Sequence, residues 1–412
     1  MRSLLLFFLP LVSLAQPPAD FDLHWLDTAA FAQRIEDVQL IGLGEATHGT
    51  REIYQLRHAL TAHLIERQQV RLILIEGGNL RCEPLNRYLQ GETITLDSAL
   101  FATSRWMWQT ESVRQMMTWL RAYNQGQSPA ERVRLYGVDQ DHYDASGERL
   151  MMAIAQLPDG DSLRRSLQRK LELDTSASAF QRVRNMEKKA VKARLAYLDS
   201  LETLLYSLNP DAFSAAQQLA LREARYHAHN LAGVWRYAEA SLHGSYGGYL
   251  EVRDPEMAHN IRWRMAKLAP GQRAVFWAHN EHIEHGAINF SGAGMYLREA
   301  LGEAYYALAI SAGPGHCLVS KAGTGAFHQP VYRHRRGLEH HLGAAVQDTL
   351  WVDFQTDFGQ KLASQPLHLT HIPAMPVSRR GSFMKLRMGE HFDGVCFVPE
   401  SEPTVWVEPQ PH

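Results

Sequence analysis

Length, composition and charge place this chain among ordinary globular proteins. It has 412 residues, of which 45% are hydrophobic and 21% charged, with 29 Gly and 18 Pro, and this composition excludes disordered, collagenous and coiled-coil classes. Lys and Arg number 42 against 44 Asp and Glu, so the formal net charge is −2. Because such a chain has no overall field that attracts phosphate backbones or anionic lipid, we expect no nucleic-acid partner.

The first residues are typical of a secretory signal peptide. Arg2 supplies a positive start, residues 4–12 are apolar, and Ser13-Leu14-Ala15 is a small-x-small cleavage site before Gln16. The apolar run is about half of the roughly 17–25 residues that a transmembrane helix needs. We therefore expect residues 1–15 to be removed, leaving a periplasmic or secreted chain without a membrane anchor.

Apolar runs along the rest of the chain predict the fold class. Four runs rich in Val, Ile and Leu each end on a polar or ionisable residue, and three more follow after residue 300: residues 38–45, 71–78, 134–139 and 274–280, then 304–310, 349–354 and 392–398. Continuous apolar runs separated by helical segments are typical of parallel strands that are buried on both faces. The prediction is an α/β fold with a mostly parallel central sheet flanked by helices.

Helical patterns fill the intervals between these runs. Ile53, Leu56, Leu60 and Leu64 recur at helical spacing, so a helix is expected to start near Thr50 and to bury one face. Residues 147–270 contain no strand-like run and are charged and rich in Leu and Ala. We expect residues 16–146 and 271–412 to form the α/β core, and residues 147–270 to form a helical insertion or cap.

Polar residues at the carboxyl ends of the first four runs are candidate site residues. Glu45, Glu76, Asp139 and His279 occupy these ends, and ligands bind at this edge of open α/β sheets. Asp139 is the weakest candidate, because it can simply accept hydrogen bonds from the next turn. A buried Glu76 needs a partner, either a histidine or Arg57, which follows Ile53 by one helical turn.

The densest cluster joins Glu45 and His48 in a Gly-rich turn. Imidazole titrates near neutrality and can take a proton from water, and a neighbouring carboxylate can fix its tautomer. Alternatively, both residues only cap the following helix. A second cluster holds His279, which ends a buried strand and is therefore the stronger candidate, and His282.

Other catalytic chemistries have weaker support. Glu45, His48, Glu76, His279 and His282 are also a possible ligand set for Zn²⁺ or Mn²⁺, but the sequence contains no compact metal motif such as HExxH. We predict no metal and no cofactor, with a metal-dependent hydrolase as the alternative. The sequence has no GxSxG motif, and Cys82, Cys317 and Cys396 indicate one disulfide at most. Histidine-activated water is the simpler hypothesis.

Six motifs carry a family resemblance. In chain order they are Gly44-Glu45-Ala46-Thr47-His48-Gly49, Arg57, Ile75-Glu76-Gly77-Gly78, Tyr136-Gly137-Val138-Asp139-Gln140, Arg253-Asp254-Pro255-Glu256-Met257-Ala258-His259-Asn260 and Trp277-Ala278-His279-Asn280-Glu281-His282. Together they resemble the erythromycin esterase family. The resemblance implies an α/β core with helical insertions, a small-molecule ester substrate and hydrolysis of the macrolactone of erythromycin-type antibiotics.

The resemblance also implies roles for individual residues. His48 is the base that activates water, Glu45 lies beside it, and the other active-site groups are Arg57, Glu76, His279 and His282. Two features depart from the family pattern: residues 291–297 match it only loosely, and an export signal is unexpected in an esterase that protects ribosomes. A non-catalytic binding protein with the same residues is a third hypothesis, and the oligomeric state is not specified.

Overall fold

The structure is a computed structural model that describes residues 23–140, 145–158, 179–243, 246–321, 325–342 and 348–407, together with residues 160, 163 and 165. The expected signal peptide, residues 1–15, lies outside these residues. In the part of the chain that is described, no helix has both the length and the apolar character required to cross a membrane.

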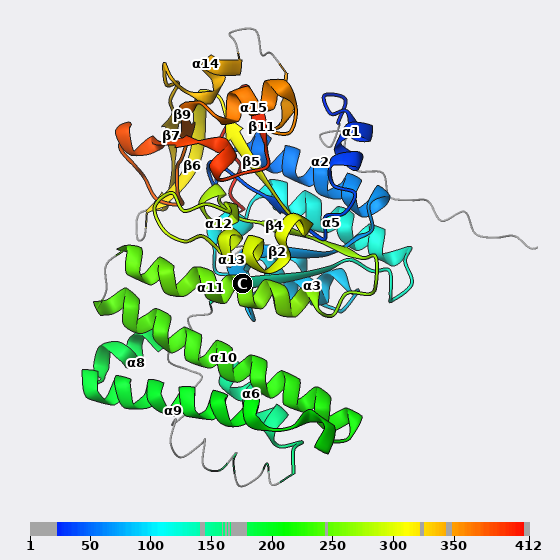
Figure 1. Ribbon diagram of the computed structural model, residues 1–412, viewed down its shortest axis with the longest axis vertical. Coiled ribbons are helices and arrows are strands. Elements are labelled where there is room, and N and C mark those ends of the chain that lie inside the picture. The colour runs from blue at the N-terminus through cyan, green and yellow to red at the C-terminus, as the bar shows by residue number, and fades with distance from the viewer. Residues whose placement is uncertain are drawn as a thin grey trace, which may run out of the picture.

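A seven-stranded sheet forms the centre of the fold, in the order β3-β2-β4-β1-β5-β11-β8 (Figure 1). Its strands are β1 Leu40–Leu43, β2 Val70–Gly78, β3 Arg134–Asp139, β4 Arg273–Trp277, β5 Tyr305–Ala312, β8 Leu350–Asp353 and β11 Gly394–Val398. All neighbouring strands pair in parallel except β8, which is antiparallel to β11. The predicted α/β class with a mostly parallel sheet is confirmed.

Both faces of the sheet are covered, which explains why its strands are apolar throughout. Successive side chains of a strand point to opposite faces: Ile73 and Ile75 of β2 join one hydrophobic cluster and Leu72 and Leu74 the other. Helices α1 Thr28–Arg34, α2 Arg51–Arg67, α3 Glu83–Leu89, α4 Leu96–Ala102 and α5 Glu111–Gln125 cover the first face. The second face packs against α11 Tyr246–Met265, α13 Ala293–Leu301 and α15 Asp357–Ala363.

Helix α2 follows the predicted pattern. Its N-cap is Thr50, whose hydroxyl lies 2.6 Å from that of Thr47 rather than capping the helix. The expected apolar stripe, including Ile53 and Leu60, is buried. Arg57 is more deeply placed than expected for a residue beside this stripe, because no part of it is exposed.

A helical group lies between β3 and β4 in the chain. Helices α6 Ala145–Ile154, α8 Ala179–Asn185, α9 Lys188–Ser207 and α10 Ala215–His243 share a hydrophobic cluster of their own. Helix α11, in contrast, contributes Met257 and Ile261 to the core beneath the sheet. Figure 1 shows α11 between the sheet and the other helices of the group, so α11 can deliver side chains to the sheet edge.

Two small antiparallel sheets and several short helices complete the fold. Strands β6 Gly315–Lys321 and β7 Gly325–Val331 form one, and β9 Pro366–Thr370 and β10 Phe383–Arg387 the other. The short helices are α12 Asn280–Ile283, α14 Leu338–Leu342, η2 Trp106–Trp108, η3 Pro210–Ala212, η4 Gly302–Ala304, η5 Arg380–Ser382 and η6 Met388–Glu390. Cys82, Cys317 and Cys396 are all buried, and none of the three forms a disulfide.

Candidate active site

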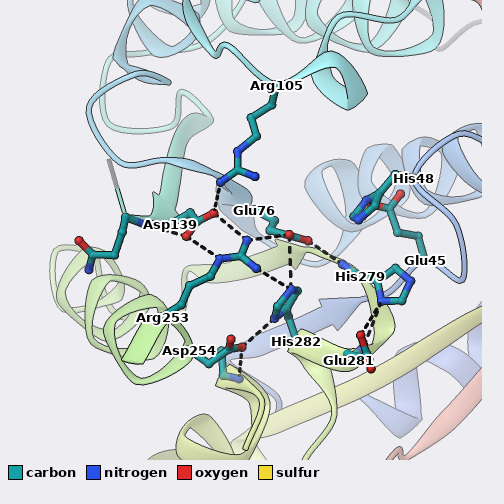
Figure 2. A network of polar contacts seen from close by, with 12 residues as sticks. Glu45, His48, Glu76, Arg105, Asp139, Arg253, Asp254, His279, Glu281 and His282 are labelled. Carbon is teal, nitrogen blue, oxygen red and sulfur yellow. Dashed lines mark hydrogen bonds and ion pairs between the residues drawn. The ribbon is translucent and has the colours of Figure 1, made fainter. Parts of the chain in front are cut away.

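Four neighbouring strands bring the predicted site residues to one edge of the sheet. Strands β3, β2, β4 and β1 lie side by side, and their carboxyl ends carry Asp139, Glu76, His279 and Glu45, all of them buried. The backbone N–H of His279 donates to Glu76 Oε2 at 3.0 Å. The rings of His279 and His48 lie with their centroids 5.1 Å apart, and Figure 2 shows these groups facing a common region.

The turn after β1 positions a carboxylate–histidine pair. His48 Nδ1 lies 2.8 Å from Glu45 Oε1, and the backbone N–H of Asn280 donates to the Glu45 carbonyl at 3.0 Å. Gly44 is required here, because a Cβ at this position would overlap the Asn280 side chain. With its Nδ1 proton directed at a carboxylate, His48 has Nε2 as the nitrogen that can accept a proton.

Arg57 completes this group from within α2. Its Nη1 lies 3.0 Å from Glu45 Oε2, and both side chains are fully buried. Its guanidinium carbon also lies 4.9, 5.5 and 5.1 Å from the ring centroids of Tyr54, Trp108 and Trp277, an arrangement that stabilises a buried cation. The guanidinium is therefore enclosed, and it neutralises and orients Glu45.

Glu76 finds its partner on α11 rather than α2. Of the two partners that the sequence suggested, Arg57 contacts Glu45 instead, but a histidine is present, because His282 Nε2 lies 3.4 Å from Glu76 Oε1. Arg253 Nη2 lies 2.7 Å from the same oxygen. Burial would raise the pKa of Glu76, but the positive charges of His282 and Arg253 hold it well below its usual value. Glu76 is therefore a carboxylate.

Asp139 joins the same network. Arg253 binds it in a bidentate manner, with Nε 2.8 Å from Oδ1 and Nη2 2.7 Å from Oδ2, and Arg105 Nη2 lies 2.7 Å from Oδ2. Asp139 also accepts from the backbone N–H of Gln140, as the weaker interpretation of this residue predicted. Burial opposes ionisation, but Arg253 and Arg105 lower the pKa of Asp139 to about 2.

His282 is held by charges on both sides. Its Nδ1 lies 2.7 Å from Asp254 Oδ1, so Asp254 and Glu76 overcome the effect of burial and raise the pKa of His282 to about 10. Arg253 Nη1 lies 3.0 Å from Nε2. Since a guanidinium can only donate, that contact favours the neutral ring, whose Nε2 accepts. In both states the Nδ1 proton points to Asp254.

His279 lies between the two groups as a neutral ring. It is the N-cap of α12, its Nδ1 accepts from the backbone N–H of Glu281 at 3.5 Å, and its Nε2 lies 3.3 Å from the Ala46 carbonyl oxygen. Burial and the neighbouring His371 and His48 hold the pKa of His279 well below its usual value. A neutral His279 with its proton on Nε2 satisfies both contacts.

Several site residues were missed by sequence reasoning. Arg253 and Asp254 stand in one of the family motifs, so the motif itself was the signal that could have found them. Arg105 and His371 follow no motif, and only the folded chain places them here. Within the described residues, the group whose ligand atoms lie close enough for a metal ion, all within 4.8 Å of one another, is His279, Glu281 and His371. It shares only His279 with the predicted ligand set.

A buried carboxylate–histidine pair lies at the carboxyl edge of a mostly parallel α/β sheet, the edge at which α/β proteins bind their ligands. Sequence comparison carries the assignment further. The family profile described as erythromycin esterase matches residues 65–401. The chain belongs to the erythromycin esterase family, as its motifs indicated, and is an ester hydrolase. Glu76, His279 and His282 lie within the matched segment, whereas Glu45, His48 and Arg57 precede it.

Two curated relatives agree with this assignment. Erythromycin esterase type II of Escherichia coli is 21% identical over 303 residues, which is 68% of this chain and 71% of the relative. Type I of the same organism is 24% identical over 281 residues, or 63% of this chain and 65% of the relative.

The structural matches extend over almost the whole chain. A mutant of the erythromycin esterase EreC in its open conformation superposes with a TM-score of 0.69 at 18% identity, covering 96% of this chain and 98% of that one. A Bacillus cereus protein gives 0.78 at 16% identity, over 94% and 95%. A succinoglycan biosynthesis protein gives 0.78 at 18%, over 94% of both chains. These identities establish the shared fold.

Proposed function

We propose that this enzyme opens the macrolactone ring of erythromycin-type macrolides by adding water to the ring ester, with His48 as the general base. Family membership and the two E. coli relatives, both named erythromycin esterases, support the substrate class. The 2.8 Å contact between His48 Nδ1 and Glu45 Oε1 is the observation that carries the mechanism.

The chemical step uses the free nitrogen of His48. Nε2 takes a proton from water, the oxygen of that water adds to the ester carbonyl carbon, and the carbonyl electron pair moves to oxygen. When the tetrahedral intermediate collapses, the ring C–O bond breaks and the departing oxygen receives the proton from His48. Glu45 stabilises the imidazolium between these two transfers, as carboxylate partners of catalytic histidines do.

The remaining residues fall into two roles under this proposal. Arg57 is a positioning residue, because its enclosed guanidinium contacts Glu45 and has no open path to a substrate. His282 and Arg253 supply positive charge from the other side of His279. Charge held in a site that excludes water stabilises a developing oxyanion.

The test is hydrolysis of erythromycin and a panel of simpler esters, with mass spectrometry to detect addition of one water. The native chain is compared with His48→Ala and with His316→Ala, which removes an exposed histidine elsewhere. We expect His48→Ala to lower kcat by about 10²–10⁴-fold, with little change in Tm, and His316→Ala to behave as native. Equal turnover by His48→Ala would contradict the mechanism. Cleavage of simple esters but not of erythromycin would rule out a macrolide substrate and would leave the role of His48 as general base in place.

Export is a separate proposal that is supported by the sequence pattern of residues 1–15 alone. Expression in a secreting bacterial host, followed by intact-mass measurement of the periplasmic or culture fraction, tests it. We expect a chain that begins at Gln16; recovery of only the full-length chain from the cytoplasm would contradict the proposal.

A further inference from the structure

A pocket of about 910 Å³ beside the β9–β10 sheet is lined by positive charge. Five of its eight lining residues carry permanent positive charge: Arg333, Arg335, Arg379, Arg380 and Lys385. The other three are His334, His368 and Phe383, so none of the lining residues is acidic. This local concentration of charge contrasts with the nearly neutral chain as a whole, whose net charge is −2.

Alternation along the two strands builds one wall of the pocket. Leu367 and Leu369 of β9 and Leu386 of β10 are buried in the core, so the intervening side chains point outward. His368 and Lys385 are direct partners in the antiparallel register. The outward face of this small sheet therefore presents a ring and a cation side by side.

Two loops attached to β9 bring in the arginines. The backbone N–H of His368 donates to the Arg336 carbonyl at 2.8 Å, which fixes the loop that carries Arg333 and Arg335. The N–H of His371 donates to the Ser382 carbonyl at 2.9 Å, which fixes the segment that follows Arg379. Backbone hydrogen bonds thus hold the positive side chains around one space.

Among the described residues, the cationic side chains of the pocket form no ion pairs, although Glu339 accepts a hydrogen bond from the backbone N–H of His334 at 2.9 Å. Other exposed arginines pair closely with acids, such as Arg87 with Glu92 at 2.7 Å and Arg149 with Glu83 at 2.8 Å. Among the described residues, none of the five cations in the pocket has a carboxylate within 4.0 Å. Like charges gathered in one space repel one another, and a bound anion removes that repulsion.

Burial and the neighbouring positive charges lower the pKa values of the two histidines in the pocket. Burial lowers the pKa of His334, and Arg335, Arg336 and Arg379 lower it further. The pKa of His368 is also lowered, by burial and then by His334. Both rings are therefore neutral.

These rings form a stack that suits an organic group. The centroids of His334 and His368 are 3.8 Å apart with an interplanar angle of 27°. Phe383 lies beside this pair, with its centroid 4.9 Å from that of His334 and its plane tilted by 54°. Cations beside aromatic rings suit an organic phosphate, since guanidinium groups bind phosphate in bidentate geometry and rings pack against rings.

We propose that this pocket binds a phosphorylated small molecule, with the phosphate among the arginines and Lys385 and the organic part against the stacked His334 and His368 rings and the neighbouring Phe383. The pocket is separate from the carboxylate–histidine site. Its His368 lies three residues before His371, or roughly 10 Å along an extended chain, and His371 is the residue whose ring contacts His279. The proposal does not depend on the identity of the ester substrate.

Calorimetry with three probes tests the proposal on the full chain at low ionic strength. Phenyl phosphate carries both the ring and the dianion, inorganic phosphate only the anion, and benzoate a ring with a single charge. We expect phenyl phosphate to bind and benzoate to bind at least about tenfold more weakly. Tighter binding of phenyl phosphate than of inorganic phosphate assigns an organic phosphate, and equal binding assigns the free anion. Equal binding would therefore overturn the part of the proposal that places an organic group against the rings.

Matched variants locate the binding. Arg379→Gln/Arg380→Gln removes two charges from the pocket, and Arg87→Gln/Arg387→Gln removes two from exposed positions outside it. We expect the first pair to weaken phenyl phosphate binding by about 10–100-fold and the second by less than about twofold. As an independent readout, bound phosphate should raise the pKa values of His334 and His368 in an NMR titration. Absence of binding by the native chain, or equal loss in both pairs, would overturn the proposal.

Discussion

The Glu45 and Glu76 groups occupy the same sheet edge and use the same three residue types, yet they are assembled differently. Glu45, His48 and Arg57 come from one strand–turn–helix segment. Glu76, Arg253 and His282 come from β2, α11 and α12, and Asp139 joins them from β3. The first group is local in sequence and small, whereas the second ties separate parts of the fold together.

The two histidines differ accordingly. His282 has contacts at both ring nitrogens, to Asp254 on one side and to Glu76 and Arg253 on the other. Among the described residues, His48 has a hydrogen-bond partner only at Nδ1. A saturated network makes a rigid frame, while a ring with one free nitrogen can exchange a proton with water. The comparison therefore favours the Glu45 group for the proposed proton transfer and gives the Glu76 group a supporting role.

Glu45→Gln should give the largest effect on catalysis. The amide keeps the shape of the side chain but loses the charge that stabilises the imidazolium, so we expect kcat to fall by about 10²–10⁴-fold. Steady-state kinetics measures this, with the ester that the native chain hydrolyses in the panel described above as substrate and the exposed Glu92→Gln as control. Because Arg57 is left without its buried partner, stability should fall as well.

A second variant separates the two consequences of that change. In Glu45→Gln/Arg57→Met both charges are gone, so the stability lost with an unpaired buried cation should largely return, whereas kcat stays low. Recovery of kcat in the double variant would show that Glu45 acts only by compensating Arg57.

Arg253→Met should give the largest loss of stability. It leaves Glu76 and Asp139 as buried carboxylates without their main partner, and breaking a buried ion pair from one side costs about 3–5 kcal/mol. Urea unfolding measures the change, and Arg387→Met removes an exposed arginine as control. If both variants unfold at the same urea concentration, the Glu76 network does not hold the sheet edge together.

The contrast between the groups also shows what a sequence can reveal. The apolar runs predicted seven strands of one sheet because strands buried on both faces need apolar residues throughout. Glu45 and His48 were found because both lie in one turn. Arg253 was not recognised as a partner of Glu76, since no periodicity tells which helix crosses the end of β2.

Sequence patterns also could not show the direction of a strand in the sheet or how deeply a side chain is buried. An apolar run does not show whether β8 is parallel or antiparallel to its neighbour. The helical spacing placed Arg57 beside the buried stripe, but its complete enclosure depends on Trp108 and Trp277 from distant segments. Tertiary packing decides both features.

The pH dependence of stability should reveal the Glu76 network on both sides of neutrality. The pKa of Asp139 is about 2 in the folded chain, against about 3.9 when unfolded. Its contribution, about 2–3 kcal/mol, is therefore present above pH 4 and lost as the pH falls towards 2. The pKa of His282 is raised to about 10, so its contribution is complete below about pH 6.5 and lost as the pH rises towards 10.

Urea unfolding across this pH range measures the loss of stability at acid pH and the loss at alkaline pH. His282→Gln should remove most of the loss of stability at alkaline pH and leave the loss at acid pH unchanged. Constant stability of the native chain between pH 7 and pH 10 would mean that His282 is neutral, as its contact with Arg253 favours, and would assign the charge of this network to Arg253 alone.

The smallest expected effect is that of metal removal. His279 Nδ1 and His371 Nε2 lie 3.9 and 3.7 Å from Glu281 Oε2, wider than the roughly 3.3 Å between ligands that zinc bonds of about 2.0 Å produce. We expect dialysis against a chelator to leave kcat unchanged, with no stoichiometric metal by elemental analysis. Activity that is lost in chelator and restored by Zn²⁺, but not restored in His371→Ala, would contradict this expectation. It would assign the activation of water to a metal ion held by His279, Glu281 and His371 rather than to His48.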